Sequence, residues 1–72
     1  DDFNIALLYS RVGDYTLAIN YFDEAILKGI EPLKSRLALA LVKLKAGRVA
    51  EAAAEISDVT NKYPDDVYKP YP

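Results

Sequence analysis

The chain has 72 residues, of which 51% are hydrophobic and 28% are charged, and its formal net charge is −2 at pH 7. A chain of this length forms at most one small domain with a limited core. Its negative charge gives no general attraction to nucleic acid or to an anionic membrane. Cysteine and histidine are absent, which excludes disulfides, thiolate metal sites and the commonest general base. We therefore expect no enzymatic activity, no metal and no cofactor.

The sequence contains neither a membrane-spanning segment nor a catalytic motif. Its longest uninterrupted apolar run extends from Leu37 to Val42, whereas a helix needs about 20 apolar residues to cross a bilayer. The serines have no imidazole to activate them, and the 3 glycines lie too far apart to form a phosphate-binding loop. We expect no membrane insertion and no nucleic-acid partner; a helical repeat that contacts RNA or DNA has only the basic residues 33–46 in its favour, and salt-dependent nucleic-acid binding would support it. Because methionine is absent, we also expect the chain to be a segment of a longer protein. The sequence does not indicate the cellular compartment of the protein.

Four helices are predicted in chain order from hydrophobic periodicity and helix-terminating residues. Gly13 and Gly47 each lie between two apolar stretches, where a left-handed glycine ends a helix and reverses the chain. Asp14 is expected to cap the second helix, and Gly29 with Pro32 separates the second helix from the third. The predicted helices cover residues 2–12, 15–28, 33–46 and 49–62.

The sequence repeats itself at an offset of 34 residues. Identical residues, most of them small or apolar, coincide at this offset: Ala6 with Ala40, Leu7 with Leu41, Gly13 with Gly47, Ala18 with Ala52, and Lys28 with Lys62. A period of about 34 residues is typical of helix-turn-helix solenoid units. The sequence therefore predicts two helical hairpins, at residues 1–32 and 33–66. Residues 67–72, rich in proline and tyrosine, are expected to form an extended tail or linker.

Small residues at recurring positions indicate close contact between helices. Ala6 and Ala18 would let the two helices of the first hairpin approach each other closely, with larger neighbours filling the surrounding space. We expect these neighbours to include Leu8, Tyr9, Phe22 and Ala25. All of these residues are interpreted as core and not as a site.

The first unit resembles a tetratricopeptide repeat. The run from Gly13 to Ile26 is similar to the turn and second helix of that family, and the preceding helix carries the expected Ile5, Ala6 and Tyr9. The second unit is looser but keeps Leu39, Ala40, Gly47, Ala52, Ile56 and the terminal Tyr63 and Pro64. The resemblance covers residues 1–66. It implies an all-α fold of antiparallel helical hairpins stacked as a short right-handed α-solenoid, and a role as a protein–protein interaction scaffold.

The resemblance also places the first helix of each unit on an inner, concave surface. There the sequence predicts an apolar strip with cations at its ends, made by Phe3, Leu7 and Arg11 in the first unit and by Lys34, Leu37, Leu41, Leu44 and Lys45 in the second. A partner peptide or helix with apolar anchors and a nearby carboxylate would complement it. The alternative is a structural or oligomerisation segment, whose strip packs against neighbouring repeats or subunits. Self-association of the chain is then expected.

Charge is divided between the last two predicted helices. Residues 33–46 carry four cations and no acid, whereas residues 49–62 carry Glu51, Glu55 and Asp58. This division predicts a basic face and an opposite acidic face. The alternative is that these are ordinary solvated faces with ion pairs between the two helices.

Overall fold

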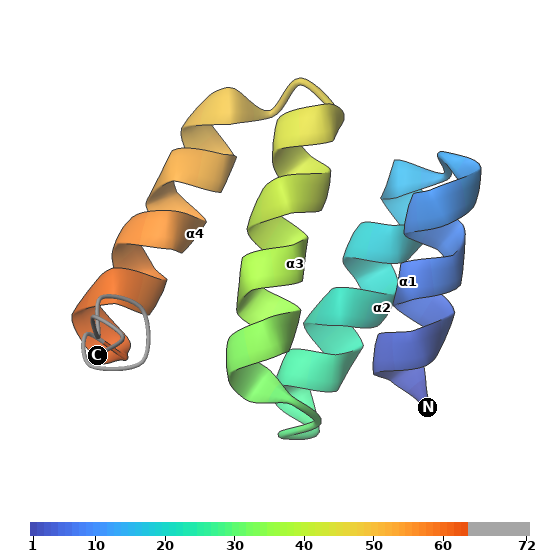
Figure 1. Ribbon diagram of the computed structural model, residues 1–72, viewed down its shortest axis with the longest axis horizontal. Coiled ribbons are helices and arrows are strands. Elements are labelled where there is room, and N and C mark those ends of the chain that lie inside the picture. Colours follow the sequence, from blue (N-terminus) through green and yellow to red (C-terminus); the bar gives the residue numbers. More distant parts are fainter. Residues whose placement is uncertain (64–72) are drawn as a thin grey trace, which may run out of the picture.

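The computed structural model describes residues 1–63, which form four α-helices and no strand (Figure 1). The helices are α1 (Asp2–Val12), α2 (Tyr15–Leu27), α3 (Pro32–Lys45) and α4 (Val49–Lys62). The expectation of an all-α chain is confirmed, and each helix begins and ends within one residue of its predicted bounds. The predicted tail at residues 67–72 and the end of the second predicted unit lie outside the described residues.

The helices pack mainly against their neighbours in the chain: α1 against α2, α2 against α3, and α3 against α4. In Figure 1, α3 lies between α4 and the pair formed by α1 and α2. An ion pair of 2.7 Å between Lys28 Nζ and Asp2 Oδ2 also joins the end of α2 to the start of α1. The arrangement is therefore two helical hairpins that contact each other through α2 and α3.

The two hairpins turn in the same way. Gly13 and Gly47 have φ angles of 87° and 82°, in the left-handed region that glycine adopts without steric cost. Around the first turn, the N–H of Gly13 donates to Ser10 O at 3.2 Å and the N–H of Asp14 donates to Tyr9 O at 2.9 Å. Around the second, the equivalent bonds run from Gly47 to Leu44 at 3.1 Å and from Arg48 to Lys43 at 2.8 Å. These bonds satisfy the last carbonyls of each helix, so the predicted helix ends at both glycines are confirmed.

The helix starts differ from one another. Asp1 and Asp14 cap α1 and α2 through their side chains, which accept from the N–H groups of Asn4 at 3.0 Å and of Leu17 at 3.2 Å. The third helix begins one residue earlier than predicted, because Pro32 occupies its first position. Proline lacks an N–H, but an N–H at this position would have no partner within the helix.

The core lies where α1, α2 and α3 meet. Its buried cluster consists of Ala6, Ala18, Ile19, Phe22, Leu39 and Val42. The buried alanines Ala6 and Ala18 agree with the predicted close contact in the first hairpin. The prediction that Leu8 fills space around them is wrong, because its side chain is exposed. None of the described helices packs on the side of α1 to which Leu8 belongs.

Candidate functional site

Three leucines form an exposed apolar row along α3. Leu37, Leu41 and Leu44 follow helical spacing, and their exposed fractions are 41%, 53% and 49%. The opposite side of α3 is occupied by Leu39 and Val42, which are buried in the core. Because α3 uses that side for packing, its leucine row is directed away from the core. We call this row the α3 strip.

The part of the predicted surface on α1 is more enclosed. Phe3 and Leu7 are half-buried and pack against the core cluster. The ring of Phe3 meets the ring of Phe22 edge-on, with centroids 5.9 Å apart and planes inclined at 65°. These two side chains therefore help to hold α1 against α2. Within the predicted binding surface, the exposed apolar side chains therefore lie on α3. Residue type alone did not indicate this difference between the two units.

The predicted cations lie near helix ends. Arg11 is in the last turn of α1 and Lys45 in the last turn of α3, and both are exposed. Within residues 1–63 neither of them forms an ion pair, so their charges are available to a partner. Lys34 is placed differently, because its Nζ lies 3.7 Å from Glu31 Oε2 in an exposed pair. Such a pair contributes little to stability and does not block another contact.

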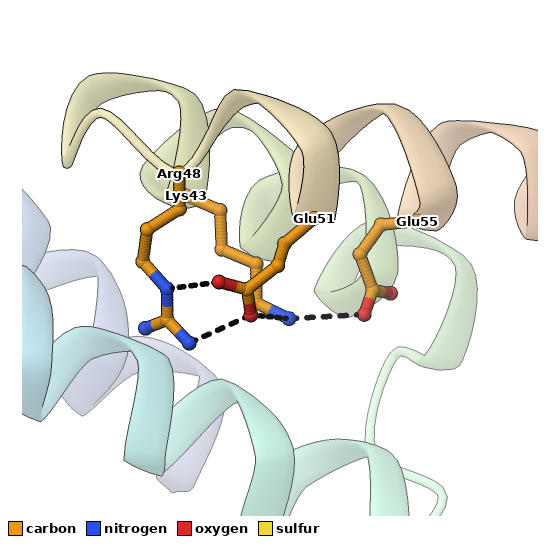
Figure 2. A network of polar contacts seen from close by, with 4 residues as sticks. All are labelled: Lys43, Arg48, Glu51 and Glu55. Atoms are coloured by element: carbon orange, nitrogen blue, oxygen red, sulfur yellow. Dashed lines mark hydrogen bonds and ion pairs between the residues drawn. The ribbon is translucent and has the colours of Figure 1, made fainter.

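A network of charged side chains links α3 to α4, and Figure 2 shows its four members. Lys43 Nζ, on α3, lies 3.1 Å from Glu55 Oε1 and 3.8 Å from Glu51 Oε1, both on α4. Arg48, at the start of α4, holds Glu51 by two hydrogen bonds of 2.7 Å. The two helices of opposite charge therefore pair with each other here, as the second interpretation of their charges proposed.

Two carboxyl groups in and beside the network have shifted pKa values. Hydrogen bonds from Arg48 lower the pKa of Glu51 below its ordinary value. Partial desolvation raises the pKa of Asp23, on α2; Lys43 opposes that rise and Glu55 adds to it. Asp23 is exposed overall, so its raised pKa reflects local surroundings and not burial of the whole residue. Charges from α2, α3 and α4 therefore interact, which the sequence did not reveal because these residues are distant along the chain.

Two further chemical features of residues 1–63 bear on function. Among them, no group of three or more histidine, cysteine, aspartate or glutamate side chains is arranged to hold a metal ion. No helix in the same range is long and apolar enough to cross a membrane.

Comparison with known proteins found no matching family model, no matching curated protein and no matching solved structure. We therefore infer the function of the chain from its surfaces.

Proposed function

We propose that the chain is a helical-repeat scaffold of the tetratricopeptide type, in which two hairpins stack as a short right-handed solenoid and bind a partner protein. The shared turn geometry at Gly13 and Gly47 supports a repeated unit, since the glycines lie one 34-residue period apart. The ligand would be a peptide or helix that lies along the first helices of the two units.

The observation that carries this proposal is the α3 strip. Single exposed leucines are common on protein surfaces, but three in a row along one helix provide a continuous apolar contact. A helix or extended peptide with apolar side chains at matching spacing would bury this row. Lys45 and Arg11 would attract an acidic group of the partner, mainly by speeding association.

The test begins with partners captured by the 72-residue chain and identified by mass spectrometry. The affinity of each purified partner segment is then measured for Leu41→Asp, after circular dichroism has established that the variant folds. Leu41→Asp places a carboxylate at the centre of the desolvated contact and should weaken binding by at least about tenfold. Arg11→Glu should weaken binding mainly at low ionic strength.

The matched control is Leu27→Asp. Leu27 is an exposed leucine on α2, with an exposed fraction of 80%, and does not belong to the α3 strip. Its substitution should leave affinity unchanged. A substitution of Glu55, on α4, would be a poor control, because it would also break the ion pair of Glu55 with Lys43. Normal binding by a folded Leu41→Asp variant would rule out the strip as the binding surface.

A second candidate function is a structural or oligomerisation segment. The observation that favours it is the exposure of large aliphatic side chains outside the α3 strip, on both terminal helices: Ile5, Leu8 and Val12 on α1, and Val49 and Ile56 on α4. These residues would be covered if further helices or other subunits packed against the ends of the chain.

A further inference from the structure

Residues one repeat apart have the same burial where they lie inside a hairpin. The pairs that are buried in both hairpins are Ala6 and Ala40, Ala18 and Ala52, and Ala25 and Val59. The two hairpins thus bury the same repeat positions between their own helices. On the side of a hairpin that faces its neighbour, packing from outside adds to the burial of these positions.

Such a difference is found between α1 and α3. Leu8 is 59% exposed, whereas Val42, one repeat later, is 2% exposed. Ile5 and Leu39 differ in the same direction. The third helix packs on α2, while none of the described helices covers the corresponding side of α1. We call Ile5 and Leu8 the α1 end face.

The opposite difference is found between α2 and α4. Phe22 is fully buried, whereas Ile56, one repeat later, is 47% exposed. Ile19 is buried and its equivalent Ala53 is exposed. The second helix is covered by α3, and no described helix follows α4 to cover it. We call Ala53 and Ile56 the α4 end face.

We infer that the α1 end face of one copy of this chain binds the α4 end face of a second copy, in the way that α3 packs on α2 within the chain. The inference deepens the second candidate function by naming the partner. The α1 end face corresponds, one repeat earlier, to the residues of α3 that pack on α2. The α4 end face corresponds, one repeat later, to the residues of α2 that α3 covers. Each copy therefore carries both halves of one contact, and all four central residues are uncharged and apolar. A second copy therefore supplies the matching side for each end face.

Head-to-tail binding of this kind leaves one free end face on each outer copy, so it continues beyond a dimer into chains or closed rings. The packing is weaker than the internal contact, because Ala53 and Ile56 are smaller than Ile19 and Phe22. The association should therefore depend on concentration. It uses faces separate from the α3 strip.

The test is sedimentation velocity of the 72-residue chain over a wide concentration range. The samples are the wild type, Leu8→Glu, Ile56→Glu and an equimolar mixture of these two variants. The wild type should form species larger than a dimer. Each variant alone should be monomeric, since one side of every contact carries a glutamate. The mixture should form only one-to-one dimers, through the intact α4 end face of Leu8→Glu and the intact α1 end face of Ile56→Glu. Leu27→Glu, at another exposed leucine, should associate like the wild type.

A second measurement does not depend on those charged variants. The chain has no cysteine, so Leu8→Cys and Ile56→Cys can be mixed in equal amounts and oxidised, and the mixed disulfide should exceed the total of the two symmetric ones, which random pairing would only equal. A monomeric wild type, dimers of Ile56→Glu alone, or a mixed disulfide that does not exceed this random proportion would each overturn the inference. Leu41→Asp separates the two proposals: it should retain self-association while losing partner binding.

Discussion

The ion pair of Lys43 with Glu55 occupies the place in the second hairpin that the stacked rings of Tyr9 and Tyr21 occupy in the first. The tyrosine rings lie 5.5 Å apart with their planes inclined at 12°, and Lys43 Nζ lies 3.1 Å from Glu55 Oε1. The members of the two pairs are one 34-residue period apart. The same junction between first and second helix is thus closed by an aromatic stack in one hairpin and by opposite charges in the other.

This equivalence predicts how the second hairpin responds to substitution. Lys43→Met keeps most of the aliphatic stem but leaves Glu55 and Glu51 without their ammonium partner, so we expect about 1–3 kcal/mol of destabilisation. The double variant Lys43→Tyr with Glu55→Tyr recreates the stack and should lie within about 1 kcal/mol of the wild type. Urea unfolding of the single and double variants measures both differences in stability from the wild type. A double variant less stable than Lys43→Met would contradict the equivalence.

The close contact inside the hairpins predicts a steric effect. Ala18→Leu and Ala52→Leu each add bulk at a buried position between two helices, and each should destabilise the fold by about 1–3 kcal/mol or more. Ala50→Leu adds the same bulk at an exposed position of α4 and serves as the control, with an expected change below about 0.5 kcal/mol. Thermal unfolding followed by circular dichroism decides, and equal melting temperatures for Ala18→Leu and Ala50→Leu would argue against close packing.

The start of α3 predicts a stabilising substitution. Glu31 has a φ angle of 45° and directly precedes Pro32, although residues before proline normally avoid helical conformations. Asparagine tolerates the left-handed region better than glutamate, so Glu31→Asn should stabilise the fold by about 0.5–1 kcal/mol. The control Glu31→Gln removes the same exposed pair with Lys34 without easing the backbone. If both variants have the same melting temperature, the backbone at Glu31 is not strained.

Acid dependence is predicted at the start of α4. Hydrogen bonds from Arg48 lower the folded-state pKa of Glu51 below its ordinary value of 4.5. Stability from this pair is therefore present above pH 4.5 and is lost as pH falls through the lowered folded-state pKa. Arg48→Gln removes the largest cause of this shift, so its difference in unfolding free energy from the wild type should be largest near neutral pH and shrink in acid. Urea unfolding at a series of pH values measures this difference, and a constant value down to strongly acidic pH would exclude the proposed linkage.

Local features of the fold could be predicted from the sequence. Helix ends at Gly13 and Gly47 and the cap at Asp14 depend on conformations that these residues favour wherever they occur. The close approach at Ala6 and Ala18 was predictable because the small residues recur at one period. Spacing on a single helix also predicted that Leu37, Leu41 and Leu44 share a face.

Burial against another helix could not be predicted in this way. Leu8 was expected to be core, and Val42 lies one repeat later, yet the structure exposes the first and buries the second. The reverse holds for Phe22, which is buried, and Ile56, which is exposed. A repeated sequence determines which positions face the next hairpin, but only the tertiary structure decides whether a hairpin is there. Hydrophobic burial removes surface from water only where another element covers it, so identical repeat positions become core in the interior and exposed at the ends.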